Sequence, residues 1–170
     1  MRLDATKRPL GQVLFCGREE AEAACRAWSI PTVVSMSDPG SPRPRVEGAS
    51  QTLRLRFHDI ETAAPGYTPP DAGDMSRLVS TLNAGLYPTL IHCEMGLSRS
   101  AAGAMIAHYL LCGDEAKAAR RMLESRSEMI RPELRPNRLM LHYADCLLGS
   151  KLLATADRFG ITRQTVRSIR

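Results

Sequence analysis

Residues 88–100 read PTLIHCEMGLSRS, and this stretch decides the fold that we predict for the chain. The apolar run before His92 and Cys93 is typical of a buried strand, whereas the Ala-rich segment after Arg99 is typical of a helix. Gly96 lies in the turn between them and permits the backbone angles of a tight curl. The stretch therefore predicts a strand, a tight loop and a helix, with Cys93 and Arg99 at the two ends of the loop.

Such a loop is suited to binding a tetrahedral anion. A helix N-terminus offers unpaired N–H groups and a partial positive charge, and a curled loop turns further N–H groups inward. The guanidinium of Arg99 can hold two oxygens of one phosphate. The same positive field stabilises a thiolate on Cys93, which makes that sulfur a nucleophile. Ser100 is placed to hydrogen-bond the sulfur, and we expect His92 to fix the loop through its ring nitrogens.

The segment from His92 to Ser100 resembles the His-Cys-x5-Arg-Ser/Thr signature of the cysteine-dependent protein tyrosine phosphatases. The glycine three places after the cysteine is most similar to the dual-specificity branch of that superfamily. The resemblance implies a phosphoester hydrolase that works through a phosphocysteine on Cys93, with no metal ion and no cofactor. It also implies a phosphate-binding loop made of Glu94, Met95, Gly96, Leu97, Ser98 and Arg99.

A phosphatase of this kind needs a carboxylic acid that protonates the leaving oxygen. In the family that the signature resembles, this acid is an Asp on a loop upstream of the cysteine, and Asp59 lies 34 residues before Cys93. Apolar and polar residues alternate just before Asp59, which predicts a strand that ends at a loop. Glu61 is a rival acid two residues away. Asp71 and Asp74 are more simply interpreted as acids in the first turn of a helix.

A second part of the resemblance lies downstream of the signature. Residues 130–137 read IRPELRPN, which is similar to the Arg-Pro…Pro-Asn segment of dual-specificity phosphatases. In that family the Asn braces the phosphate-binding loop, so Asn137 is a candidate for the same supporting role. The Pro-Asn pair also predicts the start of a helix, and one residue can serve both purposes. The resemblance covers about residues 10–149.

The order of the predicted elements indicates a single α/β domain, and the resemblance to the dual-specificity phosphatases implies a central mixed sheet flanked by helices. A length of 170 residues, 44% of them hydrophobic, is enough for one core. We assign residues 1–149 to a catalytic domain. We predict strands over 12–16, 31–36, 52–57 and 89–92, and helices over 18–28, 72–83, 99–111, 114–125 and 137–148.

Cysteine usage and hydropathy indicate the compartment of the protein. The N-terminus lacks the apolar stretch of a signal peptide, and the longest apolar-rich run, 101–113, is too short to span a bilayer. Five cysteines without close pairs favour free thiols in a reducing compartment and argue against a zinc site. We therefore expect a cytoplasmic monomer that binds neither a membrane nor a metal ion.

Residues 150–170 form a basic tail, with five Lys and Arg side chains against one acid. We expect a helical extension that packs on the catalytic domain. Its sequence also looks like a bacterial helix-turn-helix, with a recognition helix over 162–169, but a DNA-reading unit usually needs a third helix. Binding of nucleic acid is therefore not expected. Deletion of the residues after Gly149 is expected to test that role without affecting the catalytic centre.

The loop sequence also bears on the substrate. Its interior contains an acid, Glu94, and no base, which disfavours a very anionic head group at the rim. No segment predicts a deep pocket with aromatic walls. We therefore expect a shallow site for phosphotyrosine, with phosphoserine and phosphothreonine as further substrates, on a phosphorylated protein or a small phosphoester.

Two alternatives from other classes stay open. A catalytically weak phosphate-binding module keeps Arg99 and the loop but lacks a working acid. A rhodanese-like sulfurtransferase, or the phosphatase branch built on that fold, also uses a cysteine loop, and His-Cys-Glu is reminiscent of that branch. Gly96, Asp59 and the Pro-Asn pair at Asn137 favour the dual-specificity fold.

Overall fold

A computed structural model describes residues 13–42, 44, 46–125 and 134–162. Each strand and helix that the sequence predicts is present, and each boundary agrees to within one residue. The strands are β1 (Val13–Gly17), β2 (Thr32–Ser37), β3 (Gln51–Arg56) and β4 (Thr89–Cys93). The helices are α1 (Arg18–Ala27), α2 (Ala72–Ala84), α3 (Arg99–Cys112), α4 (Glu115–Glu124), α5 (Arg138–Leu148) and α6 (Leu152–Arg158).

The four strands form one sheet in the order β1-β4-β2-β3. The α/β domain is confirmed, but all the strand pairs among the described residues are parallel, so the prediction of a mixed sheet is wrong for this part of the chain. The physical reason is that α1, the 38–50 loop and α2 each carry the chain back to the starting edge of the sheet before the next strand begins. The carboxyl ends of all four strands therefore meet at one edge, where open parallel sheets bind ligands.

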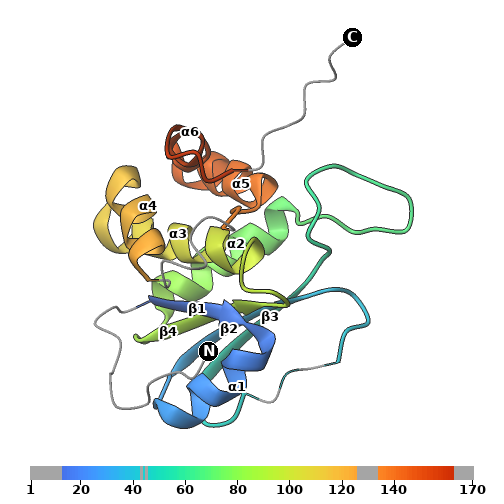
Figure 1. The fold of residues 1–170 in the computed structure, drawn as a ribbon, viewed down its shortest axis with the longest axis vertical. Helices are drawn as coiled ribbons and strands as arrows, with labels where there is room; N and C mark the ends of the chain where they lie inside the picture. The colour runs from blue at the N-terminus through green and yellow to red at the C-terminus, as the bar shows by residue number, and fades with distance from the viewer. Residues whose placement is uncertain (1–12, 43, 45, 126–133, 163–170) are drawn as a thin grey trace.

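Helices cover both faces of this sheet. Figure 1 shows α1 alone on one face and α2 to α6 on the other. The α1 face buries a small cluster that includes Cys16, Ala21, Ala24, Val33 and Leu90. Among the described residues, no helix combines the length and the apolar character that crossing a membrane requires.

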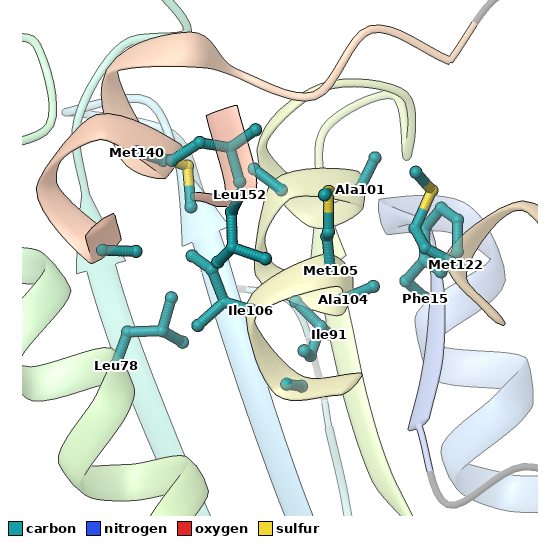
Figure 2. Close-up of a cluster of buried hydrophobic side chains, with 14 of the residues drawn as sticks. Phe15, Leu78, Ile91, Ala101, Ala104, Met105, Ile106, Met122, Met140 and Leu152 are labelled. Atoms are coloured by element: carbon teal, nitrogen blue, oxygen red, sulfur yellow. The ribbon is translucent and has the colours of Figure 1, made fainter. Parts of the chain in front are cut away.

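The larger core lies between the sheet and helix α3, which is buried on every side over residues 99–108. A Cβ atom on Gly103 would lie 2.9 Å from Cγ2 of Ile91, so only glycine lets α3 pack this closely on β4. Figure 2 shows side chains from the sheet and from helices α2 to α6 that meet around α3: Phe15, Leu78, Ile91, Met105, Met122, Met140 and Leu152. Because α3 begins at the end of the loop in residues 94–98, this packing fixes the position of the loop.

Helix α6 is part of the same core. Leu152 and Ala156 are fully buried within it. The carboxylate of Asp145 accepts hydrogen bonds from Ser150 Oγ and from the backbone N–H groups of Leu152 and Leu153, at 2.6, 2.7 and 3.0 Å. Deletion after Gly149 would therefore remove core residues, and a truncation after residue 162 is the cleaner test of a role in DNA binding. The proposed recognition helix over 162–169 lies almost entirely outside the described residues.

We predict that Asp145→Ala lowers the free energy of unfolding by about 1–3 kcal/mol, because it removes the acceptor for three donors at the start of α6. Urea unfolding followed by circular dichroism measures the change. Glu124→Ala, at an exposed position on α4, is the matched control. A loss no larger than that of the control would show that Asp145 does not hold α6.

Candidate active site

Strand β4 delivers Cys93 to the carboxyl edge of the sheet. Its Sγ atom is buried, accepts a hydrogen bond from the backbone N–H of Gly96 at 3.2 Å and lies 3.3 Å from Oγ of Ser100. Gly96 has a φ of 75°, the left-handed conformation that glycine adopts without strain. The loop of residues 94–98 therefore curls around the sulfur, directly before the N-terminus of α3, as its sequence predicts.

Arg99 is the first residue of α3, and its side chain is almost completely buried. Its Nη1 donates to Oδ1 of Asp38 at 2.7 Å and to the carbonyl oxygen of Phe57 at 2.8 Å. Its Nε is also buried, and no described residue accepts a hydrogen bond from it. An unpaired N–H of a buried cation is costly unless a ligand pairs with it, so this guanidinium is suited to an anion.

Asp59 lies on the loop that follows β3. Its Oδ1 accepts hydrogen bonds from Ser98 Oγ at 2.7 Å and from Nδ2 of Asn137 at 2.9 Å. His58 closes the base of this loop, since its N–H donates to the carbonyl of Thr68 and its Nδ1 accepts from the N–H of Thr68. Two elements far apart in the sequence thus hold the carboxyl group beside the loop of residues 94–98.

Asn137 connects three parts of this arrangement. Besides its side-chain bond to Asp59, its backbone N–H donates to the carbonyl oxygen of Ser98 at 3.4 Å. Its Oδ1 accepts from the N–H of Met140 at 3.1 Å and so caps helix α5. The same residue therefore starts a helix and contacts both the acidic side chain and the loop.

The other acids that the sequence offers as proton donors form hydrogen bonds at the starts of helices. Glu61 accepts a hydrogen bond from the backbone N–H of Arg138 at 3.0 Å, so its carboxylate is at the start of α5. Asp71 caps α2 and accepts from the N–H of Asp74 at 2.8 Å. None of these three acids is among the residues that line the pocket at Cys93.

One pocket joins the chemical groups of the site. It has a volume of about 160 Å³. Its lining residues are Asp59, Cys93, Met95, Leu97, Ser98, Arg99 and Arg135. A thiol, a carboxyl group and a guanidinium thus face the same small space. Among the described residues, no group of three or more His, Cys, Asp and Glu side chains could hold a metal ion.

Glu94 is not among the residues that line the pocket, although the sequence predicts an acid beside the bound anion. Its carboxylate accepts a hydrogen bond from Nη1 of Arg18 at 3.2 Å. Burial alone would raise the pKa of Glu94, but hydrogen bonds from Arg18 and Ser41 hold this pKa below its ordinary value. The only acid of the loop is therefore neutralised beside the start of α1, and Glu94 is not among the residues that line the pocket.

His92 contributes packing. Both of its ring nitrogens are buried, and among the described residues neither forms a hydrogen bond to residues 94–98, so the expected anchoring of the loop through them is not seen. Burial lowers the pKa of His92 to about 4, so the ring is neutral at neutral pH. Side chains two residues apart on a strand lie on the same face of the sheet. His92 therefore lies on the face of Leu90, which packs in the cluster beneath α1.

Sequence reasoning missed two residues of this site. Asp38 follows β2 and reaches Arg99 across the carboxyl edge, a contact between residues 61 positions apart that no local pattern signals. Arg135 precedes α5 and lines the pocket. The Arg-Pro-Asn triplet at 135–137 is visible in the sequence, but its proximity to Cys93 depends on the tertiary fold.

No protein-family model matches the chain, and no curated protein matches its sequence. Solved structures do match. Human DUSP28 is 20% identical, with a TM-score of 0.60 over 82% of this chain and 93% of that one. A human tyrosine phosphatase-like serine/threonine/tyrosine-interacting protein is 15% identical, with a TM-score of 0.55 over 81% and 91%. The Yvh1 phosphatase domain from Chaetomium thermophilum is 18% identical, with a TM-score of 0.55 over 81% and 90%.

At these identities the likeness establishes the fold. The chain has the α/β fold of the dual-specificity phosphatases, as the signature at residues 92–100 predicts. The match also favours the dual-specificity phosphatase fold, predicted from the sequence, over the rhodanese-like fold that was its alternative.

Proposed function

We propose that this protein is a phosphoester hydrolase that acts on phosphotyrosine, and also on phosphoserine and phosphothreonine, through a phosphocysteine on Cys93. One observation carries the proposal. The Cys93 thiol, the buried guanidinium of Arg99 and the Asp59 carboxyl line one pocket of about 160 Å³ at the N-terminus of α3. Positive charge, a nucleophile and an acid are the groups that phosphoryl transfer requires.

In the first step the Cys93 thiolate attacks phosphorus. The S–P bond forms as the P–O ester bond breaks, and the leaving oxygen takes the proton of Asp59. The N–H groups at the start of α3 stabilise the negative charge on the equatorial oxygens, together with Nε of Arg99, which donates to no described residue. Ser98 and Asn137 orient the acid through their hydrogen bonds to Asp59.

In the second step a water molecule attacks the phosphocysteine. Asp59, now a carboxylate, takes a proton from this water, the S–P bond breaks, and inorganic phosphate leaves. The hydroxyl of Ser100, 3.3 Å from Sγ, is placed to hydrogen-bond the sulfur as it becomes a thiolate again. Charge and atoms balance over the two steps: the substrate supplies the phosphoryl group, water supplies the attacking oxygen, and Cys93 and Asp59 return to their starting states.

The lining of the pocket supports a shallow, permissive site. Among the described residues that line it, none is aromatic, so it lacks the walls that would select a flat ring alone. The proposal is tested by hydrolysis of an aryl phosphate between pH 5 and 8, with reductant and without added metal. Metal-independent turnover supports it. Binding of phosphate or vanadate without turnover would instead make the chain a phosphate-binding module.

The pairing of Arg99 with Asp38 leads to a prediction. Asp38→Asn removes the charge that fixes Nη1 of Arg99, so we expect kcat/KM for an aryl phosphate to fall about tenfold or more. Steady-state kinetics measures the loss. Asp71→Asn is the matched control, because Asn is an equally good helix cap and Asp71 does not line the pocket. Unchanged kcat/KM in Asp38→Asn would show that Arg99 needs no such support.

A further inference from the structure

We propose that Arg135 binds a second anionic group on a phosphopeptide, adjacent to the phosphorylated residue. The inference rests on the proposed function and assigns its substrate class. It departs from the expectation drawn from the sequence, in which an acid at the rim disfavours additional negative charge.

Arg135 is fixed beside the phosphate-binding loop by its own backbone. Its N–H donates to the carbonyl oxygen of Leu97 at 3.0 Å. The residue is half-buried and lines the same pocket as Cys93. Arg135 therefore lines the pocket from a position separate from Arg99.

The charge of Arg135 is not neutralised by the described part of the chain. There, the only side-chain hydrogen bond of Arg135 is from Nη1 to the carbonyl oxygen of Leu134, at 2.7 Å, and no acid pairs with it. Arg18, by contrast, is paired with Glu94. A guanidinium has five N–H donors, and the carbonyl oxygen of Leu134 accepts from one of them. The remaining donors are available to a ligand.

The arrangement of charges separates two anion sites. The phosphate that reacts at Cys93 uses the loop N–H groups and Arg99, whereas Arg135 contributes a second cation in the pocket lining. A guanidinium binds a carboxylate or a phosphate through paired hydrogen bonds. Met95, with 75% of its surface exposed, adds an apolar contact at the same pocket for the body of a peptide. The ligand that fits these features is a phosphopeptide with an Asp, a Glu or a second phosphorylated residue close to the first.

The test measures binding, so it does not depend on turnover. Fluorescence anisotropy gives the Kd of three labelled phosphotyrosine peptides for full-length Cys93→Ser, alone and combined with Arg135→Gln. The peptides have Asp, Asn or a second phosphotyrosine beside the phosphotyrosine. Arg120→Gln, which removes the same charge from an exposed position on α4, is the control.

We expect the Asp peptide to bind about tenfold more tightly than the Asn peptide, and this ratio to fall to near one in Arg135→Gln but not in Arg120→Gln. The doubly phosphorylated peptide distinguishes a phosphate from a carboxylate as the preferred second group. Equal affinity for all three peptides, or a preference that survives Arg135→Gln, would overturn the inference. Failure of the proposed function appears separately, as the absence of aryl phosphate turnover by the wild type.

Discussion

Cys93→Ser is expected to lower the turnover of an aryl phosphate by at least about 10⁴-fold. The Sγ atom accepts a hydrogen bond from the N–H of Gly96, and Cys93 lines the same pocket as Arg99, whereas a hydroxyl in place of this thiol is far harder to ionise. Because the anion-binding groups stay in place, the variant should still bind phosphate or vanadate. Initial rates and equilibrium binding on the same preparation measure both properties.

Cys146→Ser is the matched control for this substitution. Cys146 is exposed on α5 and is a free thiol, so its loss should leave the rate unchanged. Turnover that survives Cys93→Ser at the wild-type rate would contradict the proposed chemistry. Loss of both turnover and anion binding would instead indicate that the loop had lost its shape.

Asp59→Asn is expected to lower kcat for a phosphotyrosine peptide by about 10²–10³-fold. The amide can keep the hydrogen bonds to its neighbours, but it cannot give a proton to the leaving oxygen. The wild-type rate should fall as pH rises, because the reaction needs the protonated carboxyl, and this basic limb should be absent in the variant. A pH–rate profile between pH 5 and 8 measures both effects.

Glu61→Gln is the control for Asp59→Asn. Its carboxylate accepts from the N–H of Arg138 at the start of α5, and Gln preserves an acceptor there. The control should therefore keep both the rate and the basic limb. The assignment of the acid would be reversed if Glu61→Gln lost the basic limb while Asp59→Asn kept it.

Local sequence patterns were sufficient to predict most of the fold. The alternation in β3, the apolar run of β4 and the capping residues at α2, α4 and α5 are interactions between near neighbours, so they are readable from one sequence. The positions of Cys93 and Arg99 follow for the same reason, since a strand, a curled loop and a helix N-terminus join within eleven residues. The mixed sheet was predicted from the resemblance, and the described strand pairs are parallel instead.

The contacts that tune the site depend on the fold and not on any local pattern. Asp38 meets Arg99 only because β2 and β4 are parallel neighbours whose carboxyl ends lie together. Glu94 was expected beside the bound anion because it lies inside the loop, yet its carboxylate forms an ion pair with Arg18 at the start of α1. The place of Arg135 at the pocket likewise depends on the packing of the chain before α5 against Leu97.

The most direct test of the account is to trap the covalent intermediate. Asp59→Asn is mixed with an aryl phosphate whose leaving group needs no proton, quenched in acid and digested for mass spectrometry. Since this variant lacks the base for the second step, a single phosphate should accumulate on the peptide that contains Cys93. Phosphate on another residue, or turnover by the wild type with no adduct on Cys93 in the variant, would contradict a phosphocysteine mechanism.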